Sequence, residues 1–212
     1  MASRSRPLFA RLYQRASVVM DEHGVAAHRR AAVAGLRGRV IEVGAGNGRM
    51  FACYPPAVTE VVAVEPEPHL RAAALDAASA APVPVTVVDG LAESLPGPDA
   101  AFDAGVTALV LCSVPSQASA LASLHRVIRP GGELRFFEHV AATEPGALRR
   151  VQRIMDKTLW PPLMGGCHTG RDTAAAITAA GFRITSIDRF VFPATGPRGP
   201  AGPHILGSAT RP

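Results

Sequence analysis

The fold of this chain is decided by the stretch Val40-Ile41-Glu42-Val43-Gly44-Ala45-Gly46-Asn47-Gly48. An apolar run that favours a β-strand carries one acidic residue near its end, and three glycines then recur at every second position. Glycine suits such a turn because it adopts positive φ angles and lets the backbone approach a ligand closely. The stretch therefore predicts a strand that runs directly into a nucleotide-binding turn.

The spacing of these glycines distinguishes two kinds of nucleotide site. A nicotinamide fingerprint places its third glycine three positions after the second, where this chain has Arg49. Here the third glycine comes after two positions and an acid precedes the first, which is the form typical of S-adenosylmethionine sites. We expect that any side chain at Gly44 or Gly46 would fill the ligand's volume. The loop residues expected to bind S-adenosylmethionine are Glu42, Gly44, Ala45, Gly46, Asn47 and Gly48.

Acidic residues also follow the next two strand-like runs. The run 61–64 ends at Glu65, about 20 residues after Gly44, where a carboxylate can accept both ribose hydroxyls. The run 83–88 precedes a turn at which we expect the adenine ring, with Asp89 accepting from its amino group. The cofactor residues expected from these later segments and from the fourth strand are Glu65, Pro66, Asp89, Gly90, Leu91, Thr107 and Leu109.

Strand-like and helix-like segments alternate along the rest of the chain. Their order predicts an α/β, doubly wound, Rossmann-like sheet that is mainly parallel and closes with an antiparallel C-terminal hairpin. We expect residues 7–36 to form an amphipathic helix that closes over the cofactor with Tyr13 inward, or packs on the sheet. The further strands are expected at 104–114, 133–138, 182–192 and 204–209, the helices at 70–80, 117–128 and 172–180, and a turn at 129–132.

The composition indicates one globular domain. With 48% hydrophobic residues, 212 residues can bury one substantial core, and no composition break divides them. We expect residues 1–36 to form an N-terminal helical segment that caps the site and residues 37–212 to form the core. The longest apolar stretch, around 106–112, is far short of the roughly 18 residues of a membrane helix. The sequence thus predicts a soluble, cytoplasmic protein without membrane insertion, and it leaves the oligomeric state open.

The cysteines and the charged residues argue against a metal site and a nucleic-acid partner. The chain has three cysteines, at positions 53, 112 and 167, and no pair has zinc-ligand spacing, so we predict no disulfide framework and no metal. The net charge is +5, with a single lysine and scattered arginines. A nucleic-acid groove would need a basic tract with interleaved aromatic residues, so we predict no nucleic-acid partner.

Several motifs carry a resemblance to known families. With its glycine loop, Glu65, the Asp89 turn and Arg129-Pro130-Gly131-Gly132, the chain resembles the class I S-adenosylmethionine-dependent methyltransferases, near the quinone-biosynthesis branch. It looks closest to the alkyl thiol S-methyltransferases, which implies a small-molecule acceptor and a seven-stranded sheet with a reversed last strand. The motifs of this narrower match are Phe51-Ala52-Cys53-Tyr54-Pro55-Pro56, Leu109-Val110-Leu111-Cys112-Ser113-Val114, Glu138-His139-Val140-Ala141-Ala142, Gly166-Cys167-His168-Thr169-Gly170-Arg171 and Pro203-His204-Ile205.

The acceptor's chemistry points to a base near the ends of the strands. A thiol reacts as its thiolate, which a pKa of about 8.5 leaves at a few per cent at neutral pH, so a base would help. His139 is the expected catalytic residue because it follows the fifth strand. A structural role is the alternative for each candidate, and oxygen, nitrogen or carbon acceptors, or cofactor binding without catalysis, stay open. The expected acceptor-site residues are Tyr13, Cys112, Ser113, His139, His168 and Arg171.

Overall fold

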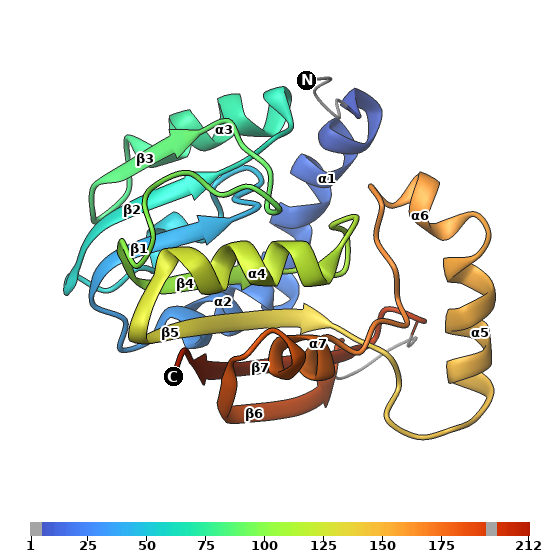
Figure 1. The fold of residues 1–212 in the computed structure, drawn as a ribbon. Helices are drawn as coiled ribbons and strands as arrows, with labels where there is room; N and C mark the ends of the chain where they lie inside the picture. The colour runs from blue at the N-terminus through green and yellow to red at the C-terminus, as the bar shows by residue number, and fades with distance from the viewer. Residues whose placement is uncertain (1–5, 194–198) are drawn as a thin grey trace.

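The structure is a computed structural model that describes residues 6–193 and 199–212. Within them, seven strands form one sheet, which confirms the predicted α/β class. The strands are β1 (Gly38–Val43), β2 (Val58–Val64), β3 (Val85–Val88), β4 (Phe102–Ala108), β5 (Ile128–His139), β6 (Arg183–Val191) and β7 (Pro203–Thr210). Their order is β3-β2-β1-β4-β5-β7-β6. The first five run parallel, and β7 lies antiparallel between β5 and β6, as the predicted closing hairpin requires (Figure 1).

Helices cover both faces of this sheet. They are α1 (Pro7–Met20), α2 (Ala26–Val33), α3 (Pro68–Ala78), α4 (Gln117–Val127), α5 (Ala147–Asp156), α6 (Trp160–Leu163) and α7 (Thr173–Ala179), with short helical turns η1 (Asp21–Val25) and η2 (Phe51–Cys53). The predicted helices 70–80, 117–128 and 172–180 match α3, α4 and α7 within two residues. None of the helices in the described part of the chain is long and apolar enough to span a bilayer.

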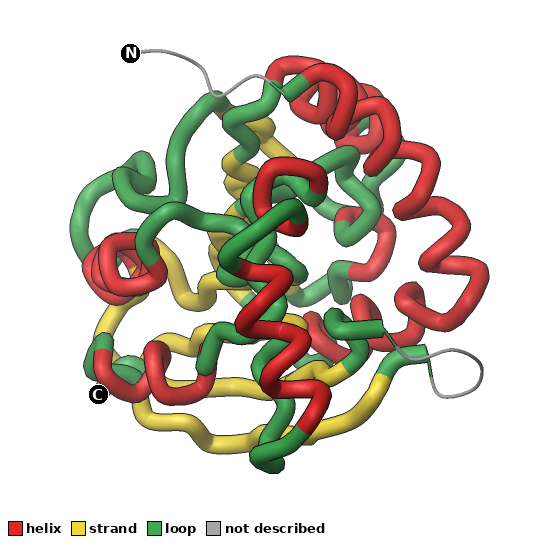
Figure 2. Tube along the Cα trace, turned by 90° about the vertical axis from the view of Figure 1, so that its right-hand side faces the viewer, coloured by secondary structure: helices red, strands yellow, loops and turns green. Residues whose placement is uncertain are grey.

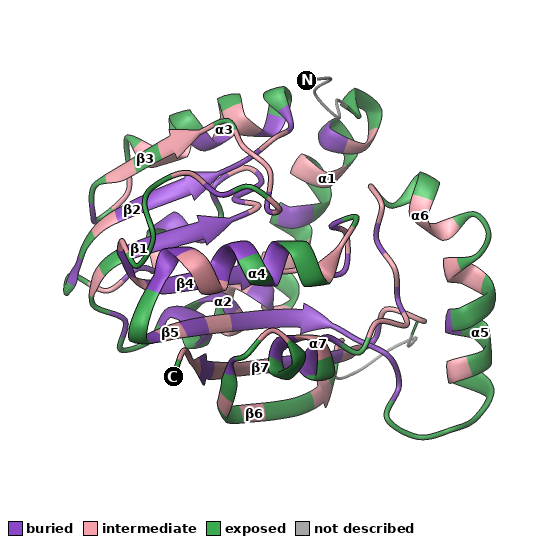
Figure 3. Ribbon diagram, viewed as in Figure 1, coloured by how far each residue is buried: buried purple, intermediate pink, exposed green. Residues whose placement is uncertain are grey.

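The central strands are buried on both faces. In β2, Val61 and Ala63 join the core under α2 and α3, whereas Val62 and Val64 join the core under α4 and α7. Successive side chains of a strand point to opposite faces, so an uninterrupted apolar run is what a doubly covered parallel strand needs. Figure 3 shows these central strands almost wholly buried, and β6 at the edge is partly exposed.

The N-terminal segment is two helices rather than one. Between α1 and α2 the chain passes through η1, where Gly24 takes φ +115°. Asp21 in this turn bonds the buried Arg29 at 3.0 Å and Arg49 after the glycine loop at 2.6 Å. The glycine breaks the predicted continuous helix 7–36, and the two ion pairs fix the bend against the loop that follows β1.

The fourth strand ends six residues earlier than the predicted 104–114. After β4 the chain turns at Leu109, which takes φ +60°. The buried carboxylate of Glu138 accepts the backbone N–H groups of Val110 and Leu111, at 3.2 and 3.1 Å. These two N–H groups therefore bond Glu138 and not a neighbouring strand, which ends β4. The sequence pattern predicts a longer strand because the side chains of Val110 and Leu111 are apolar. The predicted turn 129–132 lies inside β5, which begins at Ile128.

An insertion after β5 forms α5 and α6, which the sequence pattern does not predict. Figure 2 looks toward the carboxyl ends of the parallel strands and shows these helices in front of them. The side-chain amide of the fully buried Gln152 on α5 bonds backbone groups of Val140, Ala142, Thr169 and Pro200. One buried side chain therefore ties the insertion to four backbone positions, although α5 and α6 are otherwise largely exposed.

Candidate active site

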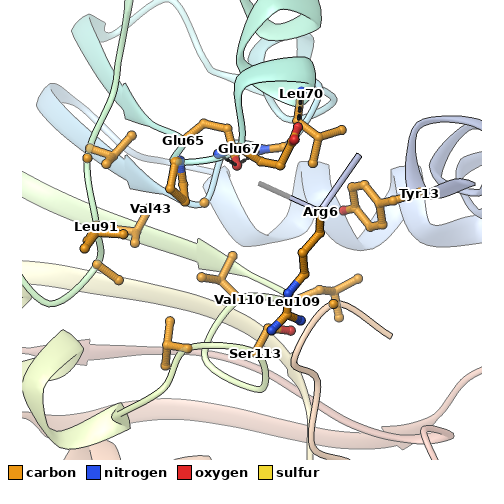
Figure 4. Close-up of a pocket in the computed structure, with 18 of the residues that line it drawn as sticks. Arg6, Tyr13, Val43, Glu65, Glu67, Leu70, Leu91, Leu109, Val110 and Ser113 are labelled. Carbon is orange, nitrogen blue, oxygen red and sulfur yellow. Dashed lines mark hydrogen bonds between the residues drawn. The ribbon is translucent and has the colours of Figure 1, made fainter. Parts of the chain in front are cut away.

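A cavity of about 210 Å³, here called the loop cavity, lies at the carboxyl ends of β1, β2 and β4 (Figure 4). This is the edge at which open parallel sheets bind their ligands. Seven of the predicted cofactor residues line it, namely Gly44, Gly46, Glu65, Pro66, Gly90, Leu91 and Leu109. The cavity also has a wall from the N-terminal segment, formed by Arg6, Phe9 and Tyr13.

The glycine loop has the backbone that the sequence predicts. Gly44, Gly46 and Gly48 take φ values of +68°, +57° and +74°, which disfavour other residues. Side chains of the protein also approach these positions, because a Cβ at Gly44 would lie 2.6 Å from a methyl group of Val110, and one at Gly46 would lie 3.2 Å from the ring of Tyr13. Both glycines are thus needed to pack side chains that themselves line the loop cavity.

Glu65 presents a buried and fixed carboxylate. It is 5% exposed, and its two oxygens accept the backbone N–H groups of Gly46 at 2.7 Å and Glu67 at 2.9 Å. Burial raises its pKa above the usual range, while the two amide donors act in the opposite direction. A carboxylate oxygen can accept two bonds, so each oxygen keeps capacity for a ligand hydroxyl.

Six predicted cofactor residues lie outside the lining of the loop cavity: Glu42, Ala45, Asn47, Gly48, Asp89 and Thr107. Glu42 is buried behind the loop, where it accepts the hydroxyl of Tyr54 at 2.8 Å and burial raises its pKa to about 7. The side-chain amide of Asn47 bonds Ser17 on α1 at 3.0 Å. Asp89 is 69% exposed at its side chain and pairs with Arg71 at 3.1 Å.

Three charged residues line the loop cavity without having been predicted there: Arg6, Glu67 and Glu93. In Figure 4 the side chain of Arg6 extends across the cavity toward Ser113. Glu67 caps α3 by accepting the N–H of Leu70 at 2.8 Å. Glu93 follows the predicted adenine turn and Arg6 precedes α1. Neither residue belongs to a motif in the sequence, so only the fold shows that both line the loop cavity.

A second, larger cavity of about 530 Å³, here called the apolar cavity, lies between α1 and α6. The two cavities share Phe9, Tyr13, Leu109 and Ser113. Four of the six predicted acceptor-site residues line it: Tyr13, Cys112, Ser113 and His139. Most of its remaining wall is hydrophobic and includes Leu8, Leu12, Trp160, Leu163, Met164 and Phe192.

Three of these lining residues form a compact group, here called the Cys-His-Cys cluster: Cys112, His139 and Cys167. Their ligand atoms all lie within 4.8 Å of one another, and all three residues are buried. His139 Nε2 lies 3.1 Å from the Sγ of Cys167, which also accepts the indole N–H of Trp160 at 3.2 Å. Burial lowers the pKa of His139, but Cys167 and the nearby acids outweigh it and leave that pKa raised.

Two predicted acceptor-site residues, His168 and Arg171, do not line the apolar cavity. The guanidinium of Arg171 donates to the backbone oxygens of Leu111 at 2.6 Å and Val114 at 2.7 Å. The backbone N–H of His168 donates to the oxygen of Cys112 at 2.9 Å. Both residues therefore hold the turn after β4 in place. His204, by contrast, lines the cavity, and burial lowers its pKa to about 4.

Comparisons with known proteins agree with this geometry. Residues 41–136 match the model of a methyltransferase domain. Thiol S-methyltransferase TMT1B of Homo sapiens is 32% identical, with 84% of this chain and 73% of the relative covered. Thiol S-methyltransferase TMT1A of Homo sapiens is 29% identical, with 100% and 80% covered. The ubiquinone/menaquinone biosynthesis C-methyltransferase UbiE of Syntrophotalea carbinolica is 30% identical, with 76% and 71% covered.

Solved structures show the same fold at low identity. A SAM-dependent methyltransferase from Thermotoga maritima superposes with a TM-score of 0.68 at 19% identity, covering 96% of this chain and 98% of its own. Geranyl diphosphate methyltransferase in complex with SAM also reaches 0.68, at 11% identity, covering 90% and 86%. The sequence relatives carry the assignment further than the fold does: this chain belongs to the class I S-adenosylmethionine-dependent methyltransferases, close to the thiol S-methyltransferase group.

Proposed function

We propose that this methyltransferase acts on a small thiol that binds in the apolar cavity. The observation that carries the proposal is that the apolar cavity adjoins the loop cavity at Tyr13, Leu109 and Ser113. An acceptor there would lie beside the methyl donor, and correct placement of two reactants supplies a large part of the catalysis in such a displacement. The thiol S-methyltransferase relatives support sulfur as the acceptor atom.

The loop cavity fits S-adenosylmethionine. The buried carboxylate of Glu65 would accept the ribose hydroxyls, and Gly44 and Gly46 would bring the backbone close to the ligand. Pro66, Gly90 and Leu91 offer a mostly apolar wall for a base. When bound, S-adenosylmethionine supplies a methyl group on a positively charged sulfur. Of the six predicted residues outside the lining, Asn47 would support the glycine loop through its bond to Ser17.

The apolar cavity favours an acceptor with little charge. Its wall is largely hydrophobic, and exclusion of water from such a wall leaves a thiolate poorly solvated and reactive. His139 stays the predicted catalytic residue. Its Nε2 faces Cys167 at 3.1 Å, so it would meet the acceptor together with the sulfurs of the Cys-His-Cys cluster rather than as an isolated base.

The N-terminal segment would act as a cap on one catalytic domain. Helix α1 lines both cavities and is tied to the glycine loop through Ser17 and Asn47. We include in the proposal a cytoplasmic location, which the three free cysteines favour. The proposal also includes a small-molecule acceptor and no nucleic-acid partner.

A second candidate function is methylation of a quinone-like acceptor at carbon or oxygen. The relative UbiE, at 30% identity, favours it. The apolar cavity has room for an aromatic ring, and its hydrophobic wall suits one. A third candidate function is cofactor binding without methyl transfer. In that case the loop cavity would bind S-adenosylmethionine, and no acceptor would be methylated.

The test is a transfer assay with labelled S-adenosylmethionine and purified protein. Small apolar thiols, phenols, amines and quinols are compared, and calorimetry measures cofactor binding in the same preparation. We expect methylation of apolar thiols, and slower methylation by a Glu65→Ala variant at a cofactor concentration near the wild-type Kd, because that variant binds the cofactor more weakly. Methyl transfer to a quinol but to no thiol would favour the second candidate function over the first. Binding of the cofactor without any transfer across the panel would contradict the proposed reaction.

A further inference from the structure

The Cys-His-Cys cluster brings together side chains from three separate segments. Cys112 lies in the turn after β4, His139 ends β5, and Cys167 follows α6. Sequence spacing gives no hint of this, because the prediction of no metal rests on the absence of closely spaced ligand pairs. The fold places two sulfurs and one imidazole nitrogen within 4.8 Å of one another.

The donor set and its spacing match a three-ligand zinc site. Zinc binds cysteine sulfur at about 2.3 Å and histidine nitrogen at about 2.0–2.1 Å in a tetrahedron, so such donors stand roughly 3.5–3.8 Å apart. Here Sγ of Cys167 and Nε2 of His139 are 3.1 Å apart, and no pair exceeds 4.8 Å. These separations lie on either side of the zinc spacing, so the three side chains would need only small shifts to form the site. Cys₂His with one open position is a recurring catalytic zinc set.

The surroundings hold these ligands in place. Arg171 bonds the backbone oxygens of Leu111 and Val114 on either side of Cys112, and the N–H of His168 bonds the oxygen of Cys112 itself. Trp160 donates its indole N–H to Sγ of Cys167 at 3.2 Å, which orients that sulfur. Nδ1 of the buried His139 has no hydrogen-bond partner among the described residues, and the ring is held by Nε2 and by an edge contact with His204 at 6.0 Å between ring centroids.

The open side of the cluster faces the expected acceptor. All three residues line the apolar cavity, which meets the loop cavity at Leu109 and Ser113. A fourth ligand that entered from the apolar cavity would therefore lie on the path to the methyl donor. A structural zinc site, by contrast, has four protein ligands and no open side.

We propose that Cys112, His139 and Cys167 bind a zinc ion whose fourth position takes the sulfur of the acceptor thiol. This inference rests on the proposed function, which it deepens by naming what activates the acceptor. A thiol that coordinates zinc is deprotonated outright, and its proton leaves to solvent. The sulfur lone pair then forms a bond to the methyl carbon, while the bond between that carbon and the donor sulfur breaks and leaves its electron pair on S-adenosylhomocysteine. The neutral thioether is a weaker ligand and departs.

The first test measures metal binding without any reference to activity. Protein purified from zinc-containing medium is analysed for metal content, and reduced, metal-free protein is titrated with Co²⁺. We expect one metal per chain, the visible absorption of tetrahedral cobalt and a sulfur-to-cobalt charge-transfer band. Addition of a small apolar thiol should change both bands, since it becomes the fourth ligand. The proposal is overturned if the metal-free protein binds neither Zn²⁺ nor Co²⁺. It is also overturned if Cys112 and Cys167 form a disulfide when these ions are present.

Variants separate the site from general effects on folding. Cys112→Ser, His139→Gln and Cys167→Ser should each weaken Co²⁺ binding by at least about tenfold. Cys53→Ser is the matched control, because that cysteine lies outside the cluster and should leave metal binding unchanged. Circular dichroism and calorimetric cofactor binding verify that each variant is folded. Equal cobalt affinity in all four variants contradicts the assignment.

The metal and the proposed reaction fail in different ways. Thiol methylation at full rate by metal-free protein overturns the zinc inference and leaves the proposed function intact. Zinc binding without methylation of any thiol retains the metal site and overturns its role in thiol activation. Loss of thiol methylation on metal removal, with restoration by Zn²⁺ and unchanged cofactor affinity, supports both.

Discussion

The backbone N–H of Gly46 donates to Oε2 of Glu65 at 2.7 Å, which joins the glycine loop after β1 to the end of β2. The same carboxylate accepts from Glu67 through its other oxygen. One buried acid thus fixes the loop and presents two oxygens at the proposed cofactor site. In this arrangement the glycine and the acid, which lie far apart in sequence, work as one unit.

We predict that Glu65→Ala weakens S-adenosylmethionine binding by ~1.5–3 kcal/mol, roughly ten- to hundredfold in Kd, because a charged acceptor is lost. Calorimetry measures the effect. Glu60→Ala is the matched control, since Glu60 lies on β2, the strand that Glu65 follows, but pairs with Arg39 away from the cavities. An unchanged Kd in Glu65→Ala would remove this residue from the cofactor site.

Tyr13 separates the two cavities, and its ring lies against Gly46 and stacks on Phe9 with ring centroids 5.8 Å apart. Tyr13→Ala should raise the KM values of both the cofactor and the acceptor by roughly tenfold, about 1.4 kcal/mol each, because its half-buried ring forms part of the wall of both cavities. Tyr13→Phe keeps the ring and should stay near wild type. A change confined to one substrate in steady-state kinetics would place Tyr13 in that substrate's cavity alone.

The sequence predicts the loop cavity better than the apolar one for a physical reason. Glycine spacing and the acid after β2 act through neighbouring parallel strands, whose order follows from the alternation of strands and helices. The Cys-His-Cys cluster depends on the turn after β4 and on the insertion after β5. No local sequence pattern predicts this turn or this insertion. Arg171 illustrates the same limit, because its charge suggests an anion site but its Nη1 donates to two backbone carbonyl groups and its Nη2 lies against Nδ1 of His168.

Asn47 ties the N-terminal cap to the glycine loop through a 3.0 Å bond from its amide to Ser17. Asn47→Ala should lose about 1 kcal/mol of stability and lower Tm by roughly 2–4 °C. We also expect faster proteolysis within α1, where Arg11 and Arg15 are exposed. Ser17→Ala should have a similar effect, and the double variant should be little worse than either one. Fully additive losses would show that the two residues act separately.

Arg171 supports the turn that carries Cys112 rather than an anionic acceptor. Arg171→Met should therefore destabilise the protein by ~2–3 kcal/mol, because two backbone oxygens lose a charged donor. The ratio of kcat/KM for an anionic and a neutral thiol of similar size should not change. Arg126→Met is the control, as that arginine also donates to backbone oxygens but far from the cavities. A selective loss for the anionic thiol would restore the recognition role.

Glu42 is a buried acid whose pKa rises from 4.5 to about 7, mainly because burial disfavours its charged form. The folded state therefore holds this proton more tightly than the unfolded state, and stability falls as pH rises from 4.5 through 7. Glu42→Gln removes the ionisation and can still accept the hydroxyl of Tyr54. We predict that the variant gains up to ~3 kcal/mol over wild type at pH 8 and that this gain shrinks toward pH 5. Denaturant unfolding across this range measures it, and a gain that is constant with pH would show that Glu42 does not titrate there.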